Sequence, residues 1–361
     1  MSKQAPSPAR WPVDIMSVGS ASVGAQVWRY RGQLNVTILA KAMFAIVPSG
    51  TATLAPPEDV LRHPVHATAN PASPLLYERD LAPYLPNAEI VFTGHAHAPH
   101  QTPVTRMHVR LALLRGETAL VDKRLEVVGD RVTNPKSPPA ASVEPKPFLR
   151  MPIVYQRAWG GLGESNNPYG TGLGSNSGRM QLPNIIALDG SQTPVTLGPV
   201  PAFYPARERL LRGTKPPELS AIPSLPDDFD GSYFHQAPED QRFDALRGGE
   251  RLVLEGLDPT HAHLETWLPA LRGLAMLHLP NGVQRWILLV PNSLVVKGDA
   301  SVFAVVCRGH FQVAHADALA GLRFAAGVEV DGAPMPWPDL QTILARPTMS
   351  APLDEPTQNL E

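Results

Sequence analysis

Three histidines lie within six positions in the segment VFTGHAHAPHQTP, residues 91–103. His95 and His97 are two residues apart, so an extended strand would place both imidazoles on one face. His-x-His is also a spacing by which hydrolases hold a catalytic metal, with His100 as a third candidate ligand. A metal site further needs carboxylates that orient the rings, and the nearest acidic residue downstream is Glu117. The segment therefore favours a strand with an exposed row of histidines, and we expect no metal and no cofactor.

Acidic residues offer a second kind of chemistry, in the segments LPDDFD (225–230) and PEDQ (238–241). If the carboxylates of Asp228 and Asp240 converged on a cleft, they could serve as acid and base. A metal- or carboxylate-dependent hydrolase that uses the loops of residues 151–245 is therefore the alternative interpretation. The segments lack the twelve-residue calcium loop with its terminal glutamate. Because aspartate also caps helices and orders turns, a structural role is favoured.

Other motifs give no sign of catalysis. The glycine-rich segment GTGLGSNSG (170–178) has neither the preceding strand nor the following helix of a dinucleotide fingerprint. A Gly-x-Ser-x-Gly elbow, a Walker loop and a His-Glu-x-x-His motif are all absent from the sequence. Cys307 lies in an apolar run and is expected to be a small buried hydrophobic residue. We therefore predict that the protein is not an enzyme.

Composition narrows the class of partner and compartment. Thirty-one basic and 33 acidic residues give a formal net charge of -2, which argues against binding to nucleic acid. The N-terminal residues lack the apolar core of a signal peptide, and no run approaches the roughly 20 apolar residues that span a bilayer. The single cysteine suits a reducing compartment. These features predict a cytoplasmic protein with no membrane partner.

Proline and strand-like patterns indicate the fold class. The chain contains 40 prolines among 361 residues, about twice the usual share of roughly 5%. Proline breaks helices and separates strands, so we predict a mainly β fold that is antiparallel, sandwich- or barrel-like and rich in loops, with a few short helices at 238–248 and 265–273. Residues 284–298 and 300–314 should form a hairpin. The predicted strands are 34–50, 88–98, 104–114, 119–133, 249–257, 273–280, 284–298 and 300–314.

The expected domain organisation follows from the linkers. Residues 1–26 are predicted to be a loose N-terminal segment and residues 27–325 a single large β-rich domain. The proline-rich segment 134–147 is the best linker candidate, so sub-domains 27–133 and 148–325 are an alternative. Residues 326–361 are expected to be a C-terminal extension, disordered from about residue 347.

An ordered series of short segments carries a family resemblance. The series comprises MPIVYQRAWGG (151–161), NPYGTG (167–172), LPNI (182–185), LGPVPAFYPAR (197–207), LPDDFD (225–230) and QAPEDQR (236–242). Together these segments resemble domain-of-unknown-function family twenty-one sixty-nine. The family usually shows a Lys-Pro pair after the RDLAP segment, and here Tyr84, Leu85 and Pro86 stand in its place. Partner contact at that position would therefore be altered in this protein.

The resemblance implies a function and a set of residues. Members of this family are encoded beside type VI secretion spike and effector genes, and some behave as adaptors. The expected partners are an effector or PAAR-type protein and the valine-glycine-repeat spike protein. Arg157 is expected to pair with Asp228 or Asp240 and so to fix one loop on another. The residues expected to bind a partner or to hold the loops are Tyr155, Arg157, Trp159, Asn167, Asn184, Asp228, Phe229, Asp230, Asp240 and Gln241.

Overall fold

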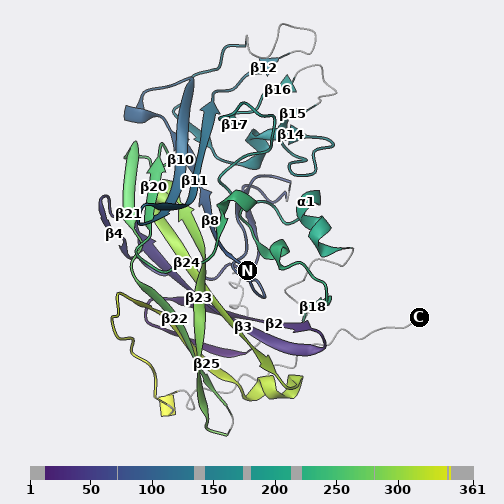
Figure 1. The fold of residues 1–361 in the computed structure, drawn as a ribbon, viewed down its shortest axis with the longest axis vertical. Helices are drawn as coiled ribbons and strands as arrows, with labels where there is room; N and C mark the ends of the chain where they lie inside the picture. Colours follow the sequence, from purple (N-terminus) through teal and green to yellow (C-terminus); the bar gives the residue numbers. More distant parts are fainter. Residues whose placement is uncertain are drawn as a thin grey trace, which may run out of the picture.

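The computed structural model of the protein describes residues 13–70, 72–133, 143–173, 180–212, 222–279, 281–339 and 341–342. Strands dominate these residues and the helices are short, which confirms the predicted mainly β fold class. Figure 1 shows two groups of long strands, one above the other, with the middle segment of the chain beside them. Each predicted strand overlaps at least one observed strand, and the predicted hairpin is present.

The larger sheet has eleven strands and occupies the lower part of the view in Figure 1. Most of its neighbours are antiparallel, whereas β1 on β25, β18 on β2 and β8 on β23 are parallel. In order of pairing, its strands are β1 (Asp14–Val18), β25 (Arg323–Val330), β22 (Leu271–His278), β23 (Gln284–Lys297), β24 (Val302–Val313), β3 (Gln33–Ala45), β2 (Ser22–Tyr30) and β18 (Ser224–Leu225), with β8 (Ala88–Thr93) on β23, β19 (Arg242–Phe243) on β8 and β5 (Thr53–Leu54) on β3.

The strand β23 joins two parts of this sheet because it changes neighbours along its length. Residues 284–289 pair with β22, whereas residues 290–297 pair with β24. The register between β23 and β24 shifts between Pro291 and Ser293, so Asn292 is the extra residue of a bulge. Proline has no N–H to give to a neighbouring strand, and bulges are among the places where a sheet tolerates it.

The smaller elements complete the fold. The six-stranded sheet contains β17 (Ile185–Ala187), β11 (Thr118–Val128), β10 (Arg106–Arg115), β20 (Arg251–Glu255), β21 (His263–Trp267) and β4 (Gly50–Thr51). The two-stranded pairs are β12 (Val132–Thr133) with β16 (Met180–Gln181), β9 (His95–His97) with β13 (Arg150–Pro152), β14 (Trp159–Gly161) with β15 (Thr171–Leu173), and β6 (Val65–His66) with β7 (Leu75–Tyr77). The helical turns are η1 (Pro99–Gln101), η3 (Tyr155–Arg157), α1 (Pro205–Glu208), η4 (Arg209–Leu211), η5 (Gly231–Phe234), η6 (Glu239–Gln241), η7 (Gly298–Ala300) and η8 (Ala316–Gly321).

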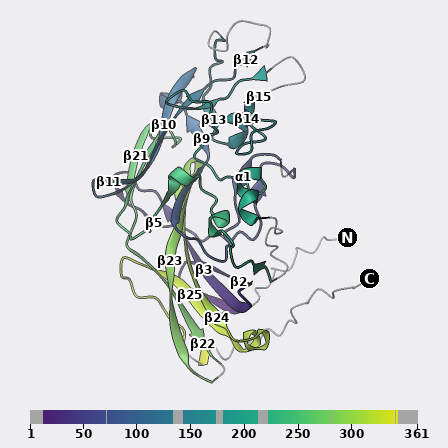
Figure 2. The same ribbon diagram turned by 45° about the vertical axis from the view of Figure 1, so that its right-hand side comes forward.

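One large hydrophobic cluster unites the two big sheets. It contains Leu111 of β10 and Leu252 of β20 together with Phe44 of β3, Phe92 of β8 and Phe303 of β24, all of them buried. Cys307 is fully buried in the same cluster, as expected, and burial raises the pKa of its thiol to about 12. The middle segment, with its short strands and single helical turns, runs along one side of the long strands in both ribbon views (Figures 1 and 2).

The two predicted helices are wrong. Residues 263–267 form β21, in which Leu264 and Thr266 are buried and their neighbours are not, a period of two that belongs to a strand. Within residues 238–248 only the single turn η6 is helical, and the chain then enters β19. Leu264 and Leu268 both pack in the main hydrophobic core, which explains why the segment predicted as helix 265–273 is extended.

Several strands lie in or cross the expected segments. The expected loose segment 1–26 contains β1 and the start of β2, and β25 crosses the expected boundary at residue 325. Strands from 27–133 and from 148–325 share both large sheets, because β3 pairs with β24 and β10 pairs with β20. The expected disorder from about residue 347 and most of the expected linker, residues 134–142, lie outside the described residues. Among the residues that the structure describes, no helix has the length and apolar character needed to cross a membrane.

Candidate partner-binding groove and the network that supports it

Asn167 holds the loop that joins β14 to β15. Its side chain is fully buried, and its Nδ2 donates to the carbonyl oxygens of Tyr155 at 2.7 Å and Trp159 at 2.9 Å. Two glycines allow this close approach, because a Cβ on Gly160 would lie 2.3 Å from the Asn167 carbonyl oxygen and a Cβ on Gly170 would lie 2.3 Å from its Nδ2. The contacts of Tyr155, Trp159 and Asn167 are thus those of a loop scaffold.

Arg157 does not pair with Asp228 or Asp240, and that expectation is wrong. Its Nη1 instead donates to Asp130 Oδ1 and to Asn184 Oδ1, at 2.9 Å in both cases. Asn184, which is buried, donates from Nδ2 to Asp130 Oδ1 at 3.0 Å. The arginine therefore ties its loop to the end of β11 rather than to the acidic segments, because Asp130 lies nearer in the fold.

The two acidic segments form ion pairs with different parts of the chain. Asp228 pairs with Arg212 at 2.8 Å on the surface, and Asp240 pairs with Lys123 of β11 at 2.8 Å. Each carboxylate thus has its own cation. Asp230 caps η5 by accepting from the Ser232 backbone N–H.

Phe229 and Gln241 pack and bond locally. The Phe229 ring lies 5.1 Å from that of Phe234, measured between centroids. Gln241 is fully buried and donates to the carbonyl oxygens of Ile90 at 2.8 Å and Leu197 at 3.0 Å. It therefore fastens the middle segment to β8. These are structural contacts, made to neighbouring rings and to backbone.

His95 and His97 share one carboxylate. Ala96 and Ala98 are buried, and the two histidine side chains, expected to form an exposed row, are only 28% and 17% exposed. His95 Nδ1 lies 2.7 Å from Asp299 Oδ2, and His97 Nε2 lies 2.9 Å from Asp299 Oδ1. Asp299 belongs to η7, the turn of the predicted hairpin, so the imidazoles fasten that turn to β9.

The acid at this turn is the feature that the spacing of the histidines did not reveal. Burial pushes the pKa of Asp299 upward, but hydrogen bonds from His95 and His97 outweigh it and hold the pKa well below its usual range. His100 lies in the turn η1, apart from this cluster's hydrogen bonds. Within the described part of the chain, no group of three or more His, Cys, Asp or Glu side chains has the arrangement of a metal site.

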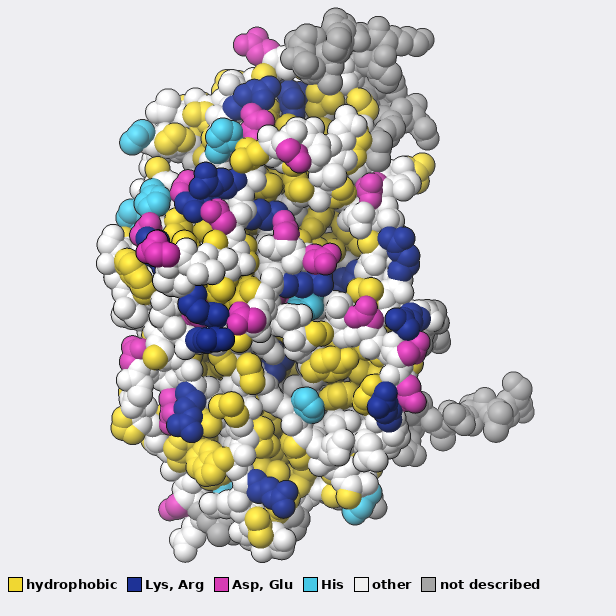
Figure 3. Space-filling view, viewed as in Figure 1, with side chains coloured by type: hydrophobic (Ala, Val, Ile, Leu, Met, Phe, Trp, Pro, Cys, Tyr) yellow, Lys and Arg dark blue, Asp and Glu magenta, His cyan; other side chains and the backbone are white. Residues whose placement is uncertain are grey.

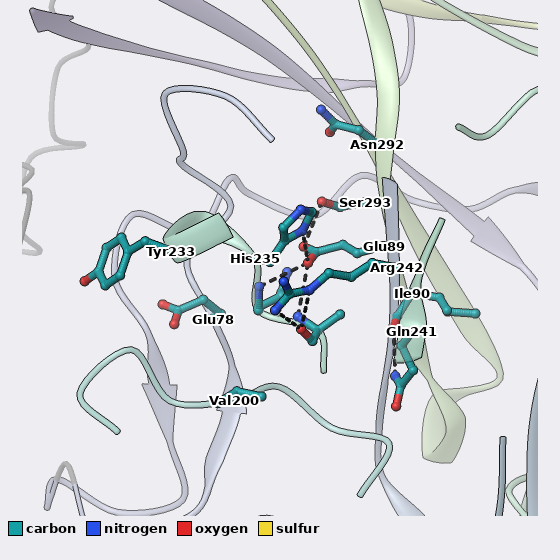
Figure 4. A network of polar contacts seen from close by, with 12 residues as sticks. Glu78, Glu89, Ile90, Val200, Tyr233, His235, Gln241, Arg242, Asn292 and Ser293 are labelled. Carbon is teal, nitrogen blue, oxygen red and sulfur yellow. Dashed lines mark hydrogen bonds and ion pairs between the residues drawn. The ribbon is translucent and has the colours of Figure 1, made fainter. Parts of the chain in front are cut away.

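A buried charge network lies beneath the middle segment. Glu89 of β8 accepts hydrogen bonds from His235 Nδ1 at 2.9 Å, from the backbone N–H groups of Gln236 and Ala237, and from Ser293 Oγ at 3.2 Å. Figure 4 shows His235 and Ser293 both directed at the Glu89 carboxylate. Burial pushes the pKa of Glu89 upward, but the bonds from His235 and Ala237 outweigh it and lower the pKa. Glu89 therefore remains ionised in the core.

These residues do not form a nucleophilic centre, although serine, histidine and glutamate stand together. In such a centre the histidine takes a proton from the serine hydroxyl. Here the Ser293 hydroxyl and His235 Nδ1 both donate to Glu89, and His235 Nε2 is buried without a partner. The network is a structural anchor that joins the loop after η5 to the bulge in β23.

Arg308 of β24 extends the network to the backbone of Asp80. It is 5% exposed, and it donates from Nη1 to Asn292 Oδ1 and Ser293 Oγ and from Nη2 to the Asp80 carbonyl oxygen. Its Nε is buried without a hydrogen-bond partner. Burial lowers the pKa of Arg308, and nearby Glu89 and Asp80 act against that shift. Because arginine keeps its proton at any physiological pH, the group is a buried cation.

This network was not predicted from the sequence, although the sequence contains a signal for it. Lys41, Glu89 and Arg308 are single charged residues inside otherwise apolar strands, in NVTILAKAMFA, AEIVF and VFAVVCRGHF. A lone charge in a buried strand needs a buried partner. Lys41 finds one in Asp80, whose Oδ2 lies 2.9 Å from Nζ. The pattern thus marks positions where distant segments meet.

A groove of about 400 Å³ lies over Arg308, between β23, β24 and the segment Pro83–Ala88. Val290 and Leu288 are 44% and 61% exposed and lie two residues apart on one side of β23, with Trp286 next along. The face seen in Figure 3 carries many hydrophobic side chains over the lower strands. The residues that line the groove are Pro83, Tyr84, Leu85, Pro86, Asn87, Ala88, Asp244, Ala245, Leu288, Val290, Pro291, Asn292, Arg308, Gly309 and His310.

The groove offers binding chemistry. Apolar side chains that stay exposed in a cluster are typical of surfaces that meet another molecule. Trp286 already meets Trp337, from the segment after β25, edge to face with the ring centroids 4.7 Å apart, so the open part of the row is Leu288 and Val290. The imidazole of His310 contacts the ring of Trp28 edge to face, and burial lowers the pKa of this imidazole. The expected binding residues of the middle segment are not among those that line this groove.

Comparison with known proteins places the chain in a family. The family model described as "Uncharacterized protein conserved in bacteria (DUF2169)" matches residues 31–308. No curated protein and no solved structure matches the chain. The matched region includes the loop scaffold around Asn167, the buried network around Glu89 and both strands of the hairpin up to Arg308. The chain belongs to the DUF2169 family of bacterial proteins.

Proposed function

We propose that the protein is a type VI secretion adaptor or chaperone. It binds an effector, or the PAAR-type domain of an effector, in the cytoplasm and assists its loading onto the valine-glycine-repeat spike protein. The observation that carries the proposal is the open groove with its apolar wall. Exposed Leu288 and Val290 and a floor that contains Arg308 suit the capture of a polypeptide.

The architecture around the groove supports the same role. An adaptor needs a surface whose shape is fixed before the partner arrives, because ordering it on binding would cost affinity. The Glu89 network fixes the bulge at Asn292 and Ser293, which forms one side of the groove. Arg157 and Gln241 fasten the middle segment to the end of β11 and to β8, and Asn167 fixes the loops of that segment on one another.

Co-purification from the native host tests the proposal. A tagged form of the chain is isolated from cells that express it at natural level, and the bound proteins are identified by mass spectrometry and by gel filtration of the complex. We expect an effector or PAAR-type protein to co-elute with the chain, with the spike protein present in part of the material. Recovery of neither the effector nor the spike, in cells that produce both, would overturn the proposal.

A further inference from the structure

The floor of the groove holds a cation whose hydrogen bonding is incomplete. A guanidinium carries five N–H donors, and Arg308 uses three of them, on Asn292, Ser293 and the Asp80 carbonyl. Its Nε has no partner, and no carboxylate among the described residues forms an ion pair with it. A buried charge without a direct counter-ion is costly. The unused donors, Nε–H and one N–H on Nη2, are of the kind that bind a carboxylate in a two-pronged pair.

The charges around the groove would admit an acid. Asp244 is the acidic residue among those that line it, and this side chain is paired with Arg115 and Arg247, at 3.3 Å from each. Glu89 lies behind Ser293, whose hydroxyl bridges it to Arg308, and it acts on Arg308 through its charge without a direct hydrogen bond. An incoming carboxylate would therefore meet a cation, with the nearest acid at the rim already neutralised.

The spacing of the apolar side chains along the groove matches that of an extended polypeptide segment. Alternate residues of a strand lie about 6.6–6.8 Å apart on the same face, and Leu288 and Val290 present that spacing along β23. Tyr84 and Leu85 line the groove as well. An extended segment presents its own alternate side chains at the same spacing, so apolar residues at every second position can contact this wall.

We propose that the groove binds an extended apolar segment of the partner, with an aspartate or glutamate side chain of that segment paired to Arg308. The inference rests on the proposed function, in that the segment is taken to belong to the effector or PAAR-type protein. It identifies the kind of sequence that the adaptor recognises.

Selection from a library of random twelve-residue peptides, displayed on phage and captured by the purified chain, tests the proposal directly. We expect the enriched peptides to alternate apolar residues and to share one acidic position. A synthetic copy of the best peptide should bind at least tenfold more tightly than its analogue with Asn or Gln at that position, measured by fluorescence polarisation. No enrichment, or enrichment of peptides without an acid, would overturn the inference.

Matched variants of the chain locate the binding. Leu288→Glu adds a charge to the open wall and should weaken peptide binding at least tenfold. Leu162→Glu makes the same change at a side chain that is 93% exposed outside the groove, and binding should be unchanged. Arg308→Lys keeps the charge and loses the two-pronged geometry, so binding should fall if the variant folds. If Arg308→Lys does not fold, peptide binding by Leu288→Glu and binding of the amide analogue of the peptide still test the inference.

The outcomes separate this inference from the proposed function. If the effector complex forms equally well with Leu288→Glu, the groove assignment is wrong and the adaptor function stands. If acidic apolar peptides bind the groove but no effector or spike protein is recovered from cells, the adaptor function is wrong and the groove assignment stands. A concentration-dependent dimer that Leu288→Glu abolishes would instead assign the groove to a second copy of this chain and overturn the inference.

Discussion

Single buried charges do much of the positioning in this chain. Glu89 accepts from His235, from two backbone N–H groups and from Ser293, and so fixes three segments at one point. Arg308 does the same for the bulge of β23 and the carbonyl of Asp80. Each bond to a charged group in a buried site contributes more than one between neutral groups.

Replacement of Glu89 by Gln tests the weight of this anchor. The amide keeps the shape but loses the charge, and its NH₂ faces groups that donate, so we expect a loss of about 2–4 kcal/mol in the free energy of unfolding. Urea denaturation followed by circular dichroism measures it. Glu117→Gln, at an exposed turn, is the matched control and should change stability by less than about 0.5 kcal/mol. Equal effects of the two changes would contradict the assignment.

At the scale of the element, the loop between β14 and β15 depends on one amide. Asn167→Asp removes the donor that serves the Tyr155 and Trp159 carbonyl oxygens and places a carboxylate beside them. We expect a loss of about 3 kcal/mol in the free energy of unfolding. The same change at the exposed neighbour Asn166 should cost less than about 1 kcal/mol. A thermal or urea unfolding series that ranks them the other way would refute the scaffold role.

The strand β22 carries a histidine that should make stability depend on pH. His278 is 3% exposed, both ring nitrogens lack partners, and desolvation, with Arg323 nearby, lowers the pKa of its imidazole. The unfolded chain, with a histidine pKa near about 6.5, therefore takes up a proton at higher pH than the folded chain does. Stability is constant above that pH and falls as the pH drops toward the folded value.

Unfolding by urea at pH 7.5, 6.5 and 5.5 measures this dependence. Wild type should lose stability across the series, and His278→Leu should lose less. His63→Leu, at an exposed position, should keep the wild-type slope. A slope that His278→Leu leaves unchanged would show that another group controls the acid response.

The strands were easier to predict than the contacts between them. Alternation such as Val109 and Leu111 in β10 is a local pattern, and it identified strands that the structure confirms. The strand β21 was mistaken for a helix, because its short run of alternating residues is read correctly only once its partner β20 is known. The pair of Arg157 with Asp130 depends on folding across 27 positions and carries no local signal.

The whole molecule interleaves the two halves of the chain. Twelve residue pairs join β3 to β24, and β8 and β10 likewise pair with strands from the later half. A fragment of residues 13–133 would therefore expose the apolar faces and edges of β3, β8 and β10. We expect that fragment to show no cooperative unfolding transition by circular dichroism, whereas the full chain does. A cooperative transition in the fragment would revive the sub-domain interpretation.

Effector secretion by the native host shows whether the protein acts as an adaptor. The gene for this chain is deleted and then restored on a plasmid, and the effector and the spike protein in the culture medium are quantified together. We expect that deletion lowers the secreted effector at least tenfold, that the wild-type chain restores it, and that the machinery still releases its other cargo. Effector secretion at the wild-type level in the deletion strain would contradict this expectation.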